Sequence, residues 1–396
     1  MRDIIRVSAL LFGLLAAMFS LLAALLLALA MALGDHAPRL MNLTLLVSLL
    51  ALGVGLGLPL AAAARRSLQQ RASPALRLPP AWWLGLIFCG LLLLGQLMLG
   101  TPLALAAIPP LHVAASLLPP LLIVAAIAPP LQRAGAGLTR RSLAVQFSYG
   151  GLVGIFLALA LEIALVTAAL ILAGAGLVLL PGGSESVERL AAELQGKMAV
   201  GDVAGMLHWL LSPGLVLGLG LLVAGVVPLA EELIKSLGVP FNAAVQGRLT
   251  RAQAFAFGVM AGAGFSFAEA LVYGAQQLPH NWAQGVGLRA LTAVIHAAAT
   301  GLFALGWYEV AVGRPARFFP YAAGGVAIHA FWNGFSGLAV VAGLAAMDGR
   351  SGLMTAASAG AALAMPLLGI TWLTALAVLI LFTRRLGASR EAPHAG

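Results

Sequence analysis

Two adjacent glutamates, Glu231 and Glu232, lie within a run of apolar residues long enough to cross a lipid bilayer. An ionisable side chain at membrane depth costs about 2.5–3.5 kcal/mol on insertion scales, so such residues are commonly retained for function. Two carboxylates in a medium of low dielectric constant do not both ionise easily, and one of them can then serve as a general acid or base. Lys235 lies one helical turn after Glu231, on the same face, and is expected to set the charge state of the pair.

Three further proton-handling side chains, Glu269, His296 and His329, follow in the next three apolar segments. Asn333 lies one turn after His329, so an imidazole and an amide share a helix face and could hold a water or donate to an oxyanion. Pro228 is expected to loosen the backbone just before the paired glutamates. Carboxylates and imidazoles clustered in four neighbouring spans predict a reaction centre within the membrane.

The composition supports a membrane location for these residues. The chain of 396 residues is 61% hydrophobic and 9% charged, whereas soluble proteins have about 25% charged residues. We therefore predict an all-α fold, a polytopic bundle of about ten transmembrane helices. The expected spans lie near 7–33, 41–64, 80–100, 108–131, 146–178, 216–240, 254–277, 289–311, 319–343 and 355–382.

The net charge of +9 is explained by membrane orientation rather than by nucleic-acid binding. With the N-terminus in the cytoplasm, 16 of the 22 Lys and Arg residues fall in cytoplasmic loops and 5 in outer loops, and Lys235 remains within a span. The positive-inside rule then places both termini in the cytoplasm. The expected surroundings are a lipid bilayer, in the cell's inner (plasma) membrane, and no nucleic acid.

The polar residues divide the chain unevenly. We predict an accessory five-helix region over residues 1–203, with an amphipathic helix in its outer polar loop at 182–203. A catalytic bundle is predicted over 204–345, and a last transmembrane helix with a polar tail over 346–396. The paired prolines at 109–110, 119–120 and 129–130 are expected to break the fourth span into short pieces.

The motifs occur in order on successive predicted spans: Glu-Glu-x-x-Lys at 231–235, Phe-x-x-x-Glu at 265–269, His296, and His-x-x-x-Asn at 329–333. This series resembles the PrsW family of intramembrane proteases, which is grouped with the CPBP superfamily of Rce1-type and APH-1-like proteins. The resemblance covers about residues 220–340. It implies a catalytic site formed by Glu231, Glu232, Glu269, His296, His329 and Asn333.

The resemblance favours an intramembrane endopeptidase, a hydrolase that cleaves a membrane-protein or membrane-anchored peptide substrate. One of the paired glutamates would deprotonate a water that attacks the scissile carbonyl. His329 and Asn333 would stabilise the oxyanion. Glu269 and His296 would position the water and return the proton to the leaving amine.

A metal-dependent version of this chemistry remains open at this point. Glu269, His296 and His329 could bind Zn²⁺ with an open position for water. The sequence has no His-Glu-x-x-His motif, which favours the version that requires no cofactor.

Two other classes of function also fit buried carboxylates. A proton- or ion-coupled membrane transporter would use mid-membrane carboxylates and interrupted helices. A non-catalytic membrane scaffold would keep its phenotype when the glutamates and histidines are replaced.

Overall fold

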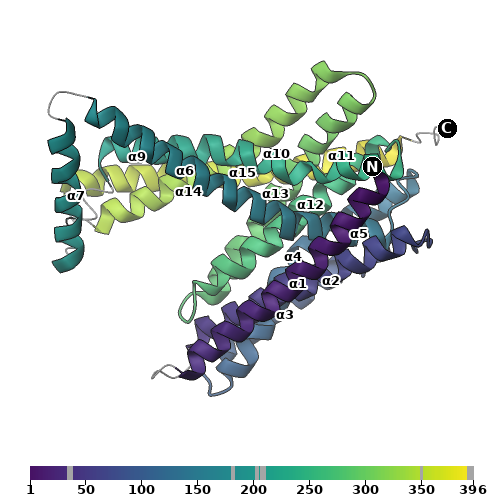
Figure 1. The fold of residues 1–396 in the computed structure, drawn as a ribbon, viewed down its shortest axis with the longest axis horizontal. Coiled ribbons are helices and arrows are strands. Elements are labelled where there is room, and N and C mark those ends of the chain that lie inside the picture. The colour runs from purple at the N-terminus through teal and green to yellow at the C-terminus, as the bar shows by residue number, and fades with distance from the viewer. Residues whose placement is uncertain (34–38, 180–182, 201–204, 206–210, 348–350, 390–396) are drawn as a thin grey trace. The chain divides into compact units, whose positions relative to one another are not determined.

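The computed structural model describes all residues except 34–38, 180–182, 201–204, 206–210, 348–350 and 390–396. The described residues form a series of helices (Figure 1), which confirms the predicted all-α class. The elements in chain order are α1 (Arg2–Leu33), α2 (Leu40–Leu68), α3 (Ala81–Met98), α4 (Ala104–Arg133), α5 (Arg140–Ser148), the π-helix η1 (Tyr149–Gly154), α6 (Ile155–Val178), α7 (Gly183–Val200), α9 (Pro213–Leu221), the π-helix η2 (Leu222–Val226), α10 (Val227–Ser236), α11 (Gly238–Gln246), α12 (Arg251–Ala275), α13 (Trp282–Ala311), the 3₁₀ turn η3 (Pro315–Arg317), α14 (Phe318–Met347) and α15 (Ser351–Ala388).

Within the described part of the chain, ten helical segments are long and apolar enough to cross a membrane. They follow the ten predicted spans in order, so the prediction of a polytopic helix bundle is confirmed. The helix predicted in the polar segment 182–203 is α7. Residue 182 and residues 201–203 of that segment lie outside the described residues.

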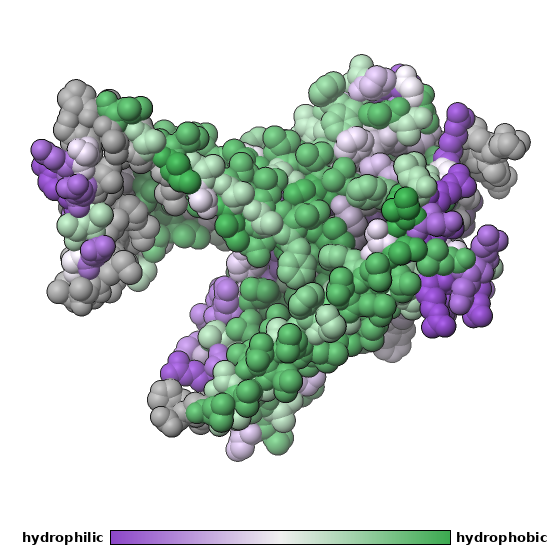
Figure 2. Space-filling model, in the orientation of Figure 1, coloured by the Kyte–Doolittle hydropathy of each residue, from purple (hydrophilic) through white to green (hydrophobic). Residues whose placement is uncertain are grey.

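The surface of α1 shows why this fold needs a membrane. Large apolar side chains such as Leu11, Met18 and Leu25 are more than half exposed along this helix. Figure 2 shows hydrophobic side chains covering the outward face of α1. An apolar surface this extensive is unusual on a protein that contacts only water, and it suits contact with acyl chains.

Helix α4 overturns one expectation from the sequence. It runs unbroken from Ala104 to Arg133 with six prolines inside it, so the prediction of short pieces was wrong. Proline fixes φ near −65°, a helical value, but it removes the hydrogen bond to the residue four positions earlier and its ring crowds the carbonyl of that residue. Neighbouring helices enclose α4, which packs against α2, α3, α12 and α13. This enclosure stabilises a helix that lacks several of its internal hydrogen bonds.

Helix α12 is the most enclosed of the candidate spans, and its glycines allow this packing. A Cβ atom at Gly264 would lie 1.9 Å from the carbonyl oxygen of Phe147 on α5. A Cβ atom at Gly262, on the side toward α13, would lie 2.3 Å from the carbonyl oxygen of His296. Only glycine permits such close backbone approaches, which give membrane helices their van der Waals contact.

The described chain forms two compact units. The first comprises Met1–Phe156, Glu232–Ile328 and Trp372–Gly396, and the second comprises Leu157–Glu231 and His329–Thr371. Every boundary between them falls inside a continuous helix, in α6, α10, α14 and α15. The first unit combines α1 to α5 with α12 and α13, and the predicted division into accessory and catalytic regions stays a prediction about function.

Candidate active site

The packing of α12 against α13 determines which site residues of the first unit lie opposite one another. Gly258 faces the carbonyl oxygen of Thr300, and Gly262 faces that of His296, so the two helices run antiparallel. Two turns further along α12, Glu269 is opposite Arg289. One side of α13 thus presents Arg289, His296 and Thr300 at spacings of roughly two turns and one turn.

Glu232 and Lys235, both on α10, form a fully buried ion pair. Lys235 Nζ donates to Glu232 Oε1 at 2.8 Å, and Thr300 Oγ1 donates to Glu232 Oε2 at 2.7 Å. The sequence paired Lys235 with Glu231 by helical spacing, and the structure shows this ion pair with Glu232 instead. Both spacings of three and four residues place side chains on one helix face, so the sequence could not choose between them.

His296 continues this network toward α12. Lys235 Nζ lies 2.9 Å from His296 Nδ1, and His296 Nε2 lies 2.7 Å from Glu269 Oε2. An ammonium group has only donors, so Nδ1 accepts from Lys235. The hydrogen of a neutral imidazole is then on Nε2, and it is donated to the carboxylate of Glu269.

Glu269 is also held by a cation, Arg289, which the sequence placed at the start of a predicted span. Arg289 donates through its guanidinium to Glu269 Oε2 at 2.5 Å, and it lies over the ring of Tyr273 with 5.1 Å between the charge and the ring centroid. We predicted that the span begins at Arg289, whereas α13 begins at Trp282. Arg289 therefore lies two turns inside the helix, on the face that carries His296.

An aromatic ring closes one side of the network. Lys235 Nζ lies 4.0 Å from the centroid of the Phe265 ring, and the Phe265 and His296 rings are 5.4 Å apart. A ring face attracts an ammonium group, most strongly where water is excluded. Phe265 and Glu269 lie one turn apart on the same face of α12, so both side chains reach the network.

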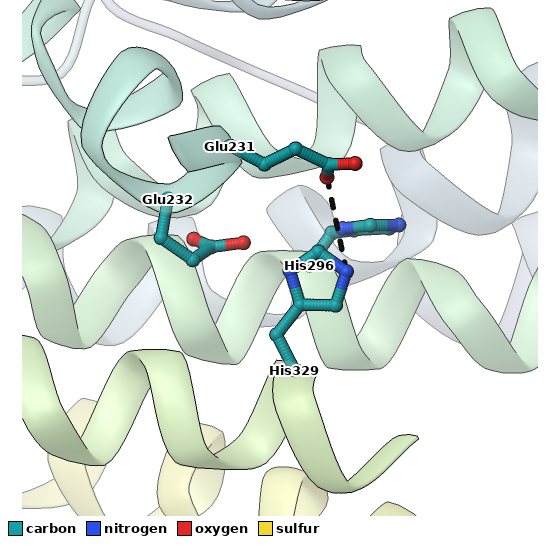
Figure 3. A group of neighbouring side chains, drawn as sticks. All are labelled: Glu231, Glu232, His296 and His329. Carbon is teal, nitrogen blue, oxygen red and sulfur yellow. Dashed lines mark ion pairs between the residues drawn. The ribbon is translucent and has the colours of Figure 1, made fainter. Parts of the chain in front are cut away.

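Glu231 and His329 form a pair within the second unit. His329 Nε2 lies 3.7 Å from Glu231 Oε2, which is longer than a hydrogen bond, and both side chains are buried. Figure 3 draws this pair with its dashed line, together with Glu232 and His296. The contact is therefore an electrostatic one between a carboxylate and an imidazole, two groups that can each carry a proton.

Asn333 contacts the backbone of the second unit. Its Nδ2 donates to the carbonyl oxygen of Val223 at 3.3 Å. Val223 belongs to the π-helix η2, which ends just before Pro228 and the start of α10. Proline lacks the N–H that a helix needs, so an irregular backbone here agrees with the loosening predicted from Pro228.

The predicted side chains therefore form two groups. Glu232, Lys235, His296 and Glu269 are connected in the first unit, and Glu231 contacts His329 in the second. Sequence reasoning missed Arg289 and Thr300. The signal for both was present, since they lie on the same helical face of α13 as His296.

The connected network contains two carboxylates, an ammonium, a guanidinium and an imidazole. A family described as PrsW family intramembrane metalloprotease matches residues 139–370, which is more than half of the chain. The chain belongs to the PrsW family. It is therefore an intramembrane protease, a hydrolase whose substrate is embedded in the membrane. Searches among curated proteins and solved structures found no match.

The PrsW match is wider than the motifs alone indicated. It begins at residue 139, before α5, and continues into α15. The sequence motifs suggested about residues 220–340. The fifth predicted span and the polar segment that holds α7 therefore belong to the family region, although they carry none of its clustered ionisable residues.

Proposed function

We propose that this chain cleaves a peptide bond of a membrane protein or membrane-anchored peptide with a water activated by Glu231. The observation that carries the proposal is the different environment of the two adjacent glutamates. Glu232 is held by Lys235 and Thr300 at hydrogen-bond distance, whereas Glu231 is 3.7 Å from His329. A carboxylate fixed by an ammonium serves to hold charge, and a carboxylate beside an imidazole can exchange a proton as a general base.

Each residue then has a defined role in the proposed reaction. Glu231 takes a proton from water, and the resulting nucleophile attacks the scissile carbonyl. His329, beside Glu231, donates toward the oxyanion. The proton held by Glu231 passes to the leaving amine as the carbon–nitrogen bond breaks.

The remaining residues position this machinery. Lys235 keeps Glu232 ionised and holds His296 Nδ1, while Glu269 and Arg289 fix the other side of the imidazole. Asn333 has one amide N–H committed to Val223, so we assign it to the support of the helix backbone more than to the oxyanion. Buried hydrogen-bond partners of this kind hold a reactive group in one orientation.

The family is described as a metalloprotease, and whether Zn²⁺ fits here depends on which ligand atoms of the buried residues are available. Glu231, Glu232, His296 and His329 are all buried and offer the ligand types that zinc prefers. However, His296 uses Nδ1 to accept from Lys235 and Nε2 to donate to Glu269. As arranged, His296 has no lone pair for a metal, and the two carboxylate oxygens of Glu232 accept from Lys235 and Thr300. Only Glu231 and His329 of the four then remain as ligands, fewer than the three that a catalytic zinc site needs, so we propose metal-free chemistry.

The orientation and location of the chain are also proposals. Arginines gather at the start of α1, the end of α2 and the start of α5, which favours a cytoplasmic position for these ends and for both termini. The inner (plasma) membrane of a cell fits this asymmetry. The substrate would then enter the site from the lipid.

Membrane proteomics tests the proposed function directly. Cells that produce the wild type are compared with cells that produce Glu231→Gln at the same level, and Glu162→Gln on α6 is a matched control. We expect one membrane protein to accumulate uncut with Glu231→Gln only. Equal cleavage by all three proteins would overturn the proposal. Ion-coupled flux in liposomes that depends on Glu231, without any cleaved product, would indicate a transporter.

A further inference from the structure

A large cavity in the first unit has no part in the proposed reaction. Its volume is about 780 Å³, and its walls come from α1, α2, the loops at Ser73 and Thr139, α5, η1 and α11. Cavities that bind small molecules commonly measure about 300–1,000 Å³. None of the residues assigned above to the site lines it, so it requires a separate explanation.

The rim of this cavity is positively charged. Arg6 on α1 and Arg141 on α5 both line it, and Arg66 lies close enough to repel Arg141. The Nε atoms of Arg6 and Arg141 are buried without a hydrogen-bond partner. Asp3 pairs with Arg6 at 3.0 Å but is itself largely exposed, and no acidic residue is among the described residues that line the cavity. The rim therefore has an excess of positive charge and unused donors.

The rest of the lining is mainly apolar. Phe12 follows Arg6 along α1, Leu60 precedes Arg66 on α2, and Val153 follows Arg141 along α5 and η1, so these side chains lie away from the arginine-bearing helix ends. The lining on α1 runs from Ile4 to Phe12, which is about 12 Å along a helix axis. Figure 2 shows hydrophilic side chains around the start of α1 and hydrophobic ones further along it. A ligand that fills this cavity must be polar and anionic at one end and apolar at the other.

The geometry points to an anionic phospholipid as the occupant, with its phosphodiester between Arg6 and Arg141 and an acyl chain along Phe12 and Leu60. Guanidinium groups bind phosphate oxygens through paired, charge-assisted hydrogen bonds. Basic pockets between membrane helices bind the headgroups of anionic lipids. A soluble phosphate would leave the apolar depth of the cavity empty, so the amphipathic walls favour a lipid.

The same cavity walls also contact helices α10 and α11. Gln146 Nε2 donates to the carbonyl oxygen of Gly238 at 3.1 Å, and Tyr149 donates to that of Ile234 at 2.9 Å. Gln146 Oε1 is buried without a hydrogen-bond partner and is thus available to a lipid hydroxyl. Ile234 is the neighbour of Lys235, so an occupant of the cavity would support the helix that carries the ion pair.

Lipid binding to the purified full-length protein tests this inference. Native mass spectrometry in a mild detergent would compare phosphatidylglycerol with phosphatidylcholine of the same acyl chains. Each arginine near anionic lipid contributes about a fivefold change in affinity, so we expect at least that preference for phosphatidylglycerol. Arg141→Gln should remove it. Arg140→Gln is the matched control, since Arg140 is the preceding, exposed residue and does not line the cavity.

Two further measurements keep the test decisive. If Arg141→Gln does not accumulate, Arg6→Gln on α1 tests the same phosphate contact. Ala9→Phe fills the apolar part of the cavity, so it should weaken binding of the lipid but leave binding of the soluble headgroup, glycerophosphoglycerol, unchanged. If the wild type binds the soluble headgroup as tightly as the lipid, the cavity is a phosphate site instead. Equal binding of the two lipids, or equal loss in the Arg140 and Arg141 variants, would overturn the inference. None of these readouts depends on proteolysis.

Discussion

Replacement of Glu232 by glutamine tests the ion pair on which the proposed roles depend. Lys235 and Glu232 have side chains with 0% exposure, and their charged atoms are 2.8 Å apart. Glu232→Gln keeps the size of the side chain but leaves a buried ammonium without its carboxylate. Removal of one partner from a buried ion pair costs about 3–5 kcal/mol. Glu231→Gln leaves this pair intact, so we expect it to cost less stability while it abolishes cleavage.

A double-mutant cycle with Lys235→Met isolates the interaction free energy between Lys235 and Glu232 from the effects of their other contacts. Lys235→Met alone leaves Glu232 as a buried carboxylate without its ammonium, and it should lose a similar amount of stability. Replacement of both charges by neutral groups of similar size is often neutral. The double variant should therefore be more stable than either single variant, with a coupling free energy of about 2–3 kcal/mol.

The unfolding free energy of each variant in the same detergent gives the four values of the cycle. Cleavage of a reporter substrate, measured in parallel, should stay lost in the double variant although stability returns. That combination would show that the charges serve the reaction and are dispensable for the fold. The reasoning is refuted if Glu232→Gln is as stable as the wild type, or if the double variant is the least stable of the four.

Three other results are expected from the same geometry. Gly262→Ala should destabilise the protein by about 1–3 kcal/mol, because the new methyl group meets the carbonyl oxygen of His296; unfolding measurements with Gly287→Ala, where there is open space, are the control. Arg289→Gln should reduce the rate of cleavage about 10–100-fold with little change in substrate affinity, as Glu269 then holds His296 less firmly; Arg289→Lys should recover part of it. A strong chelator should leave cleavage by the pure protein unchanged, and metal analysis should find less than one metal ion per chain.

The sequence predicted the spans well because a bilayer imposes a simple requirement on composition. Twenty or more apolar residues must occur together, and this pattern does not depend on how the helices pack. For the same reason, ionisable residues within these apolar runs were easy to recognise in the sequence. Helix α4 was the exception, because the sequence does not reveal that four neighbouring helices enclose its prolines.

The details of the site were harder to predict because they depend on helix register. The sequence predicts that this span begins near residue 289, since a charged residue is a natural place to begin an apolar span. Trp282 in fact starts α13 seven residues earlier, where it is buried and donates to His112. Only contacts distant in sequence could place this start. Once it is known, the spacing of Arg289, His296 and Thr300 follows from the helical period.

The charges in the network explain how so many ionisable groups are tolerated at membrane depth. Glu232 and Glu269 supply two negative charges, Lys235 and Arg289 supply two positive charges, and the contacts of His296 leave its imidazole neutral. Each charge has an opposite partner within 2.8 Å, so the desolvation cost is offset locally. Glu231 lies beside a histidine at 3.7 Å. A group that must gain and lose a proton in each reaction cycle is best placed beside a side chain that can itself exchange a proton, and this is the physical reason to propose Glu231 and not Glu232 as the general base.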